Sequence, residues 1–581
     1  MTVDDEQTGT RPTGRESGDL DELFGDPRLT GSFDYSSIVA DDDARRMSET
    51  AEAVLDEWGA GAEFVPAALG GRWVSTEDLV RRWRPVFRRD PALGLGHGLT
   101  SLVAALNVWV AGDESQRVEV AARLLRGERI AVGFHEFGHG SGLLGNECVA
   151  ERVGDLWFVH GSGQVINNVD RAESVLIIAR TSREPGSRSH SLLLWYKDAG
   201  TRPYADTSRR VLTAGMRGCR IGEADFRGLP IPVEDTIGAP GMAAETALKA
   251  SQVSRAVIPA LAVATVDASL HLAVAYGSER SLYGGRVLDL PHARALLAGA
   301  IADFLVADAF SSVVVRALHL APTDCLMLTA ASNALVPQLL MSVMDDLALL
   351  FGSTFYARVP PYDVFEKFLR DVALVPIIHD GSMASLLTVL PNLPDWLRTS
   401  RRTAATDPAL FRLGDHLDEL LFDRFTLGAG AGDSLGAALH DPRIRSGFSP
   451  GAASQVLDRL AVAFDHVRDE ISELEPTQLG AETTPHAFGV AHRLTLALAA
   501  AAWAGVCAEG GGAVTSDPLI QIAALQRIEA RLAGGPITPL DPAVVDRLLE
   551  VADDFVARNV RFALPVREDP PQAAHRKEPR P

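Results

Sequence analysis

The chain has 581 residues, of which 55 are Lys or Arg and 76 are Asp or Glu, so its formal net charge is -21. So acidic a chain is unsuited to binding nucleic acid or an anionic membrane surface, and we expect neither partner. The length exceeds the usual size of one hydrophobic core, which predicts several domains. The four cysteines are scattered without a C-x-x-C pair, which predicts no disulfide framework or zinc site and favours a reducing, cytoplasmic location.

The spacing of apolar residues changes along the chain and predicts an α+β protein. Three- and four-residue spacing indicates helices at the start, short apolar runs separated by turn clusters indicate an antiparallel sheet or barrel, and helical spacing then returns. In chain order we expect a disordered tail (1–30), an N-terminal helical domain (31–129), a central β-barrel or sandwich domain (130–240), a helical bundle (241–400), a C-terminal helical extension (401–567) and a disordered tail (568–581).

Several helices are predicted individually. Residues 256–276 are apolar on most faces, which is typical of the central helix of a bundle. In the extension, helices are expected at 452–474, 485–508 and 542–563. The most apolar run, 494–508, is shorter than the ~20 residues that cross a bilayer. We therefore expect a buried helix there and no membrane span.

One short motif permits two interpretations. Residues 135–139 read His-Glu-Phe-Gly-His, a pattern in which two histidines on one helix face bind zinc and the glutamate acts as the base of a metalloprotease. Glycines within and after the motif oppose a helix, and a strand-like run precedes it. Gly145 also stands where the longer zinc motif has a third histidine. The zinc interpretation is therefore disfavoured, and no metal is expected.

The second interpretation treats the motif as one of a series of matches in a fixed order. A G-T-x-E-Q-K helix and L-x-x-G-E are matched by residues 111–117 and 124–128. The motifs T-E-P-x-A-G-S-D, G-D-x-Y-x-I-N-G and I-T-N correspond to residues 136–142, 154–161 and 166–168. A G-x-R-G and F-x-x-V-x-V-P exit corresponds to 216–232, and E-R-x-x-F-G, Q-x-F-G-G-x-G and Y-E-G-T correspond to 279–284, 351–352 and 379–382. Through these segments the chain resembles the acyl-CoA dehydrogenase family. The resemblance ends near residue 397 and implies helical, β and helical domains in this order, followed by an added helical domain.

The resemblance implies that a carboxylate removes the α-proton of an acyl thioester. The family's Y-E-G-T glutamate corresponds to Asp380, which is the predicted catalytic base. The chain has one residue more than the family between the Arg370-Asp371 pair and this carboxylate, so His379 is the rival for the catalytic position. A third alternative is that Asp380 caps a helix beginning near Met383, because Asp is a preferred N-cap residue.

For the cofactor, FAD, the resemblance assigns contacts with the flavin edge to His135, Ser141 and Asn167. The serine is the family's own residue, whereas His and Asn replace threonines and keep the capacity to donate and accept hydrogen bonds. The tryptophan that covers the flavin ring in the family is replaced by Val165.

Contacts with the adenosine half are assigned to Arg280, Tyr283, Phe351 and Gly352. In the family, the arginine reaches the pyrophosphate of a neighbouring subunit, where a guanidinium forms charge-assisted hydrogen bonds. The glycine-rich turn that follows Phe351 in the family is not retained here.

The first functional hypothesis is an FAD-dependent dehydrogenase that desaturates an acyl-CoA or an acyl group on a carrier protein, passing electrons to electron-transfer flavoprotein or to oxygen. The alternatives are a flavin-poor or flavin-free member of the fold acting as a scaffold or a non-redox enzyme, and an oxygen-using oxidase or monooxygenase. By resemblance we expect a homodimer or homotetramer. The acidic surface would repel an acidic carrier protein unless a basic patch lies beside the tunnel mouth. The basic run at 81–89 is a candidate for such a patch, although a run of this kind more often forms a solvated helix face.

Overall fold

The computed structural model describes residues 19–564, except residues 32, 135–137, 139–141, 379–380, 401–405, 429, 431, 450, 481, 536 and 538. The predicted C-terminal tail 568–581 lies outside the described residues. The predicted N-terminal tail was drawn too long, because Leu20–Phe24 form a helix whose Leu20 and Phe24 side chains are buried. Asp19 caps this helix by accepting a hydrogen bond from the Asp21 amide.

Seven helices precede the sheet in the described part of the chain. Their starts follow local capping chemistry: the Ser75 hydroxyl accepts the Asp78 amide at 3.0 Å, and Asp113 and Gln116 form a reciprocal capping box. The helices are α1 (Leu20–Phe24), α2 (Tyr35–Asp43), α3 (Glu49–Trp58), α4 (Thr76–Arg89), α5 (Pro91–Leu93), α6 (Thr100–Ala111) and α7 (Glu114–Leu125). A π-helical segment, η3 (Gly94–Leu99), joins α5 to α6.

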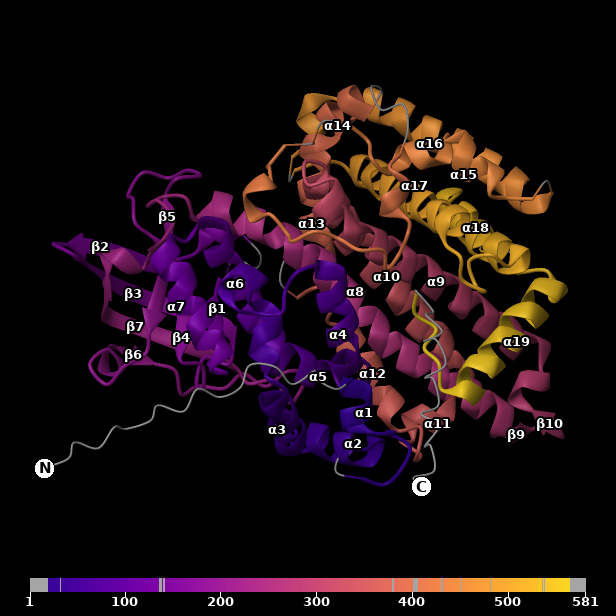
Figure 1. Ribbon diagram of the computed structural model, residues 1–581, viewed down its shortest axis with the longest axis horizontal. Helices are drawn as coiled ribbons and strands as arrows, with labels where there is room; N and C mark the ends of the chain where they lie inside the picture. The colour runs from indigo at the N-terminus through magenta and orange to yellow at the C-terminus, as the bar shows by residue number, and fades with distance from the viewer. Residues whose placement is uncertain are drawn as a thin grey trace, which may run out of the picture.

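A mixed sheet follows and occupies the left side of the molecule in Figure 1. Its strands are β1 (Ile130–Gly133), β2 (Val149–Val153), β3 (Leu156–Asn167), β4 (Ser174–Arg180), β5 (His190–Tyr196), β6 (Ala205–Asp206), β7 (Ile221–Pro232) and β8 (Thr236–Ile237). The order is β6-β7-β3-β2-β4-β5-β8, with β1 also paired to β4. The predicted antiparallel pattern is only partly correct, because β1 and β2 run parallel to β4.

β1 and β2 pair with successive parts of the same edge of β4. β1 pairs with the first part of β4, up to Gly133 opposite Ile177, and β2 starts at Val149 opposite Arg180. The chain therefore departs after β1 and returns to the same edge at β2. Of the motif 135–139, only Gly138 is among the described residues.

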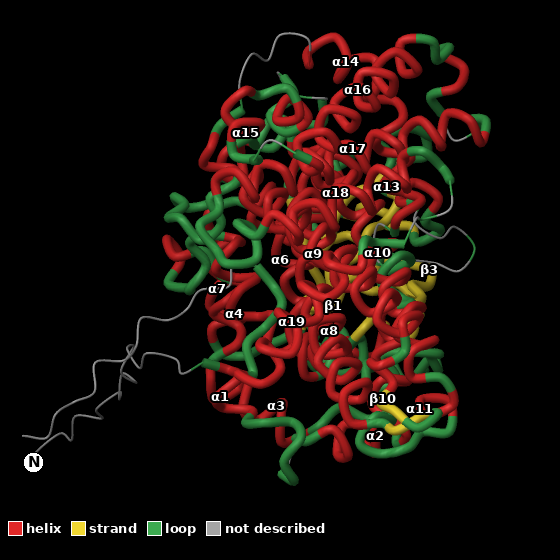
Figure 2. Tube along the Cα trace, turned by 90° about the vertical axis from the view of Figure 1, so that its right-hand side faces the viewer, coloured by secondary structure: helices red, strands yellow, loops and turns green. Residues whose placement is uncertain are grey.

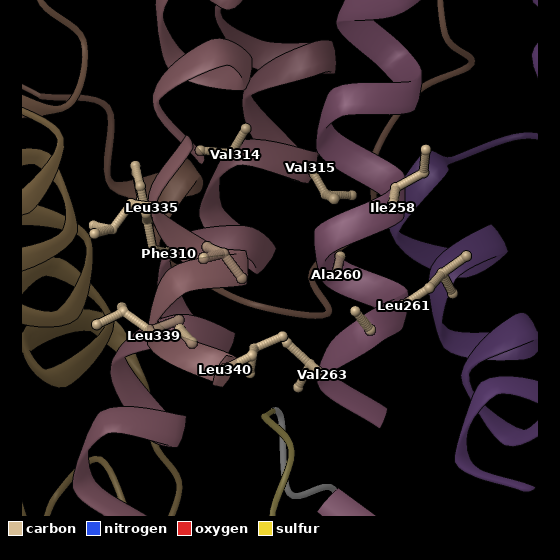
Figure 3. Packing of buried hydrophobic residues seen from close by; sticks show 14 of the residues in the cluster. Ile258, Ala260, Leu261, Val263, Phe310, Val314, Val315, Leu335, Leu339 and Leu340 are labelled. Atoms are coloured by element: carbon tan, nitrogen blue, oxygen red, sulfur yellow. The ribbon is translucent and has the colours of Figure 1, made fainter. Parts of the chain in front are cut away.

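Three long helices form the centre of the molecule: α8 (Ala243–Glu279), α9 (Pro291–Leu320) and α10 (Cys325–Phe351). Figure 3 shows apolar side chains from all three packed together, including Val263, Phe310 and Leu340. The prediction of a central helix at 256–276 is confirmed, because α8 is buried along most of its length. A hairpin of β9 (Ser281–Leu282) and β10 (Gly285–Arg286) separates α8 from α9, and α11 (Ser353–Tyr356), α12 (Val364–Val372), α13 (Ser382–Val389) and α14 (Leu393–Ser400) follow α10.

Five helical stretches among the described residues are long and apolar enough to cross a membrane by length and composition. They are 91–111, α8, α9, α10 and 485–509, and between 61% and 100% of their most apolar windows is buried inside the protein. An all-round apolar helix is expected in the core of a large protein as well as in a bilayer.

The extension covers α9 and α10 and appears in orange and yellow in Figure 1; Figure 2 shows α16, α17 and α18 together in the turned view. Its helices are α15 (Pro442–Ser446), α16 (Ala452–Ser472), α17 (Pro485–Glu509), α18 (Pro518–Leu532) and α19 (Pro542–Arg558). The sequence predicted three of these and missed α15 and α18. α19 ends before the predicted 563, because Asn559 adopts a left-handed conformation with φ of 54°. The predicted α+β class, with extra C-terminal helices, is confirmed.

Candidate active site

The loop that carries the predicted base joins α12 to α13. His379 and Asp380 themselves lie outside the described residues, but their neighbours are fixed. The Ser382 amide donates to the Pro376 carbonyl at 2.8 Å. A Cβ atom on Gly381 would lie 2.7 Å from the same carbonyl oxygen, so this turn requires glycine. The N-cap of α13 is Gly381, one residue after Asp380, so the helix-cap alternative is wrong.

The far side of the same loop is attached to α10. The Ser382 hydroxyl donates to the Asn333 carbonyl at 3.1 Å, and the Asn333 side-chain amide donates to the Ser385 hydroxyl at 2.9 Å. Ser382, Ser385 and Asn333 are all buried. These hydrogen bonds therefore fix the start of α13 relative to α10 of the central bundle.

Upstream of the loop, α12 is held by a buried cluster of charges. The Lys367 ammonium lies 2.6 Å from Asp90 Oδ1 and 2.6 Å from Asp371 Oδ2. Burial alone would lower the pKa of Lys367, but the two carboxylates outweigh burial and raise it. Asp371 also accepts the Met216 amide, which attaches the exit of the sheet domain to α12. The Arg370-Asp371 pair of the family pattern thus holds helices together here, since Arg370 bonds Asp42 and Glu366.

Asn167, predicted to contact the flavin edge, ends β3 and is buried. Its side-chain nitrogen donates to the Thr100 hydroxyl at 2.8 Å and faces the Leu95 carbonyl at 3.4 Å. Its Oδ1 atom is buried and has no hydrogen-bond partner among the described residues. Val165 lies at a break in the register with β7, with φ of 56° and a half-exposed side chain. An acceptor left without a donor fits a bound group that carries an N–H or O–H.

A polar network that the sequence analysis missed supports this strand end from η3. His97 Nδ1 lies 3.2 Å from Glu52 Oε1, and His97 Nε2 lies 3.2 Å from Asp56 Oδ1. Arg171 donates to both Glu52 oxygens at 2.8 and 3.0 Å. Burial alone would raise the pKa of Glu52, but the hydrogen bond from His97 and the charge of Arg171 lower it to about 2.

The glycines of η3 allow the surrounding side chains to pack closely. A Cβ atom on Gly98 would lie 2.6 Å from the Trp83 ring and 2.7 Å from the Phe64 ring. The alternation Gly-Leu-Gly-His-Gly in the sequence was the signal that could have revealed this network. We use the name inner wall for Glu52, Asp90, Gly94–Leu99, Asn167, Asn168, Arg171 and Lys367.

The residues predicted to bind the adenosine half gather at the other end of α8. Arg280 is the C-cap residue of α8, and Tyr283 occupies the β9–β10 turn with φ of 53°. The Tyr276 hydroxyl lies 3.3 Å from the Phe351 carbonyl, which brings the end of α10 and Gly352 beside this hairpin.

Phe351 itself is not a surface residue. Its ring is 1% exposed and packs at 4.4 Å from Phe365 and 4.9 Å from Tyr276. Gly352, the next residue, is exposed, and Tyr283 is 89% exposed. We use the name outer end for the exposed residues Arg280, Leu282, Tyr283, Leu349, Gly352, Tyr356 and Val359.

The structure therefore divides the predicted site residues into two groups. α8 is 37 residues long, about 55 Å at the usual helical rise, and it runs from the sheet to the outer end. Asn167 lies on the sheet side, and Arg280, Tyr283 and Gly352 lie at the far end (Figure 1). His135 and Ser141 lie outside the described residues.

The basic run at 81–89 does not form a docking surface. Arg84 and Arg89 are buried, and Arg88 is largely buried against Asp267. Arg81 is exposed but already pairs with Asp78 at 2.9 Å. The apolar members of the run, Trp83 and Phe87, face the core as expected.

Comparison with known proteins places this architecture. No family model matches the sequence. The probable acyl-CoA dehydrogenase FadE25 of Mycobacterium tuberculosis is 24% identical over 342 residues, which cover 59% of this chain and 86% of that protein. The short-chain specific acyl-CoA dehydrogenase of Clostridium acetobutylicum is 28% identical over 294 residues, covering 50% and 75%.

Solved structures share the fold at lower identity. The glutaryl-CoA dehydrogenase complex with glutaryl-CoA has a TM-score of 0.58 at 18% identity, covering 67% of this chain and 97% of that chain. The prolyl acyl carrier protein oxidase AnaB has a TM-score of 0.55 at 16% identity, covering 61% and 96%. The FAD complex of PigA has a TM-score of 0.58 at 16% identity, covering 66% and 99%.

About two thirds of this chain thus accounts for nearly the whole of each solved neighbour, which defines the acyl-CoA dehydrogenase fold. Together with the curated relatives, this makes the protein a divergent acyl-CoA dehydrogenase-like protein with added C-terminal helices. The curated relatives are oxidoreductases that act on CH–CH groups.

Proposed function

We propose that this protein is an FAD-dependent dehydrogenase that introduces an α,β double bond into an acyl thioester, with coenzyme A or a carrier protein as the thiol. The observation that carries the proposal is the match to 86% of the length of an acyl-CoA dehydrogenase. The anchored loop before α13, where the resemblance puts the base, supports it.

In the proposed reaction, the Asp380 carboxylate removes the α-proton of the thioester. When bound, FAD supplies the acceptor for the β-hydrogen as hydride. Aspartate is one methylene shorter than the family's glutamate, a difference of roughly 1.5 Å that matters because misplacement by about 1 Å can cost a hundredfold in rate. The extra residue before Asp380 compensates for the shorter side chain in this proposal. The contacts of Gly381 and Ser382 then keep the loop in place.

The described residues fit the cofactor at one point. Asn167 Oδ1 is a buried acceptor that has no donor among the described residues, so it can receive a hydrogen bond from the flavin. Its side-chain nitrogen is already bonded to Thr100, which fixes the orientation of the amide. His135 and Ser141 remain proposed partners of the flavin edge.

The first experiment is the visible spectrum of the purified protein, followed by release and quantitation of flavin. We expect near-stoichiometric FAD and bleaching on addition of an acyl-CoA. A colourless protein that does not take up added FAD would instead support a flavin-free member of the fold, since Val165 leaves the ring without an aromatic cover.

The base assignment is tested by Asp380→Asn. We expect desaturation to fall by about 100- to 10,000-fold, the usual contribution of a general base, with unchanged FAD content. Asp395→Asn, an exposed aspartate paired with Arg398, is the matched control and should retain activity. Loss of activity in His379→Gln but not in Asp380→Asn would transfer the role to His379.

A second candidate function is oxidation of a carrier-bound acyl group with oxygen as acceptor. The similarity to the prolyl acyl carrier protein oxidase AnaB favours it. Oxygen consumption and peroxide formation during turnover would distinguish it from transfer of electrons to electron-transfer flavoprotein.

We also propose a homodimer or larger assembly in the cytoplasm. The resemblance implies that one FAD contacts residues of two subunits. A neighbouring copy would therefore supply Arg280, as the resemblance implies. The exposed Tyr283, Leu349 and Tyr356, which are 89%, 69% and 84% exposed, support an interface at this end.

A further inference from the structure

The chain returns to the central bundle after its last helix. α19 ends at Arg558, Asn559 reverses the direction, and the following residues run inward (Figure 1). Phe562, Ala563 and Leu564 are 2%, 7% and 4% exposed, respectively. These three residues are therefore part of the buried core.

The backbone of this segment is held first by Asp267 on α8. Asp267 Oδ1 accepts the Phe562 amide at 2.6 Å and the Ala563 amide at 3.2 Å. The other carboxylate oxygen accepts Arg88 Nε at 2.7 Å. Each oxygen of this fully buried carboxylate therefore has its own donor.

Asp308 on α9 and Arg84 on α4 hold the next peptide unit. Asp308 Oδ2 accepts the Leu564 amide, while its Oδ1 lies 2.5 Å from the Arg84 guanidinium. Arg84 also donates to the Leu564 carbonyl at 3.2 Å and to the Ala260 carbonyl at 3.0 Å. The N–H and the C=O of Leu564 are thus both bound by one buried ion pair.

Aromatic rings pack around the side chain of Phe562, the first residue of the segment. The Phe562 ring lies 4.9 Å from the His271 ring, 5.5 Å from Phe555 and 6.5 Å from Phe304. These contacts add side-chain selectivity to the recognition of the backbone.

We propose that α4, α8 and α9 form a binding site for an apolar tripeptide, and that the chain's own Phe562–Leu564 segment is its ligand. The site recognises the ligand through two carboxylate acceptors for backbone amides and one guanidinium donor for a backbone carbonyl. Because buried carboxylates need donors for both oxygens, the central bundle is complete only when the end of the extension is bound. The site holds the extension to the bundle as a latch.

Hydrogen exchange on the full-length protein tests the proposal. In the unaltered chain, the amides of Phe562, Ala563 and Leu564 should exchange at least 100-fold more slowly than in a free peptide. Replacing the ion pair by apolar residues of similar size, Arg84→Met with Asp308→Leu, should accelerate exchange of these amides at least tenfold. Exchange at free-peptide rates in the unaltered chain would overturn the proposal.

The matched control is the double variant Glu77→Leu with Arg316→Met. This largely buried pair joins the same two helices, α4 and α9, but contacts residues 409–415 instead of residues 562–564. It should leave protection of residues 562–564 unchanged. Equal acceleration in both double variants would show a general loosening of the bundle and would contradict specific binding.

A ligand-side variant decides the question if the helix variants do not fold. Leu564→Pro removes the backbone N–H that donates a hydrogen bond to Asp308, whereas Leu564→Ala keeps this N–H. We expect faster exchange at Phe562 and Ala563 with proline than with alanine, by at least fivefold. Equal exchange in the two variants, or protection that rises with protein concentration because a second copy supplies the segment, would overturn binding within one chain.

Discussion

The inner wall and the outer end, the two regions that the resemblance connects with one cofactor, are built in opposite ways. In the inner wall, Asn167 and Lys367 are buried and bonded to residues from several elements of the same chain. At the outer end, Tyr283 and Tyr356 are 89% and 84% exposed. The inner wall is therefore organised before anything binds, whereas the outer end presents groups whose partners must come from outside the chain.

The largest effect is expected where the inner wall depends on one charge. Lys367→Met would leave Asp90 and Asp371 buried without their counterion, and breaking a buried pair in this way costs about 3–5 kcal/mol of unfolding free energy. Urea unfolding measures the loss. The control Lys249→Met removes a more exposed lysine paired with Glu245, which should cost under about 1 kcal/mol. Similar losses in the two variants would mean that the cluster around Lys367 does not organise the wall.

The next effect is a dependence of stability on acid. The pKa of Glu52 is lowered from 4.5 to about 2 in the folded protein. The contribution of Glu52 to the free energy of unfolding is therefore fully present above pH 4.5. It is lost as the pH falls toward 2, by about 3 kcal/mol in total. Comparing urea midpoints of the unaltered protein and Glu52→Gln between pH 6 and pH 2.5 checks this. The variant should be the weaker one at pH 6, and the difference should shrink with acid; a constant difference would contradict the linkage.

Much of the architecture was predictable because apolar spacing reflects burial directly. The run 256–276 is apolar on most faces and lies within the central helix α8, and the strand-like runs between 130 and 237 form the sheet. The parallel pairing of β1 and β2 with β4 was not predictable, since spacing along one strand says nothing about the direction of its neighbour.

The inner wall and the latch were not predictable for a different reason. Asp267 and Asp308 are charged residues within helices, which usually indicates a solvent-exposed face, yet both are fully buried. Their partners are 179 to 296 residues away in sequence, as with Arg88 for Asp267 and Leu564 for Asp308. Glycines at 94, 96 and 98 likewise conceal a helical segment, because they favour a loop by propensity and are needed here for close packing.

A smaller effect tests this packing. Gly98→Ala would bring a methyl group within 2.6 Å of the Trp83 ring, which must shift, and overpacking of this kind costs about 1–3 kcal/mol. Gly489→Ala in α17 meets only the end of the Arg493 side chain at 3.4 Å and should stabilise the helix by roughly 0.5–1 kcal/mol. If η3 is packed as described, the unfolding temperature should fall for Gly98→Ala and rise for Gly489→Ala. A rise for both variants would show that the side chains around Gly98 can move to accept the methyl group.

The smallest effect on stability is expected at the outer end. This prediction tests most directly whether the outer end, unlike the inner wall, needs a partner from outside the chain. Tyr283→Ser changes an exposed side chain, so the unfolding free energy should move by no more than about 0.5 kcal/mol. If a second copy covers this end, the same change should weaken association at least tenfold in sedimentation equilibrium. Leu212→Ser, which alters a 72% exposed residue next to the sheet, is the control and should leave association unchanged. Because Arg280 lies beside Tyr283 in the same hairpin, FAD retention should fall together with association. Weakened association with full FAD retention would separate the interface from the cofactor, and the inner wall alone would then hold the flavin.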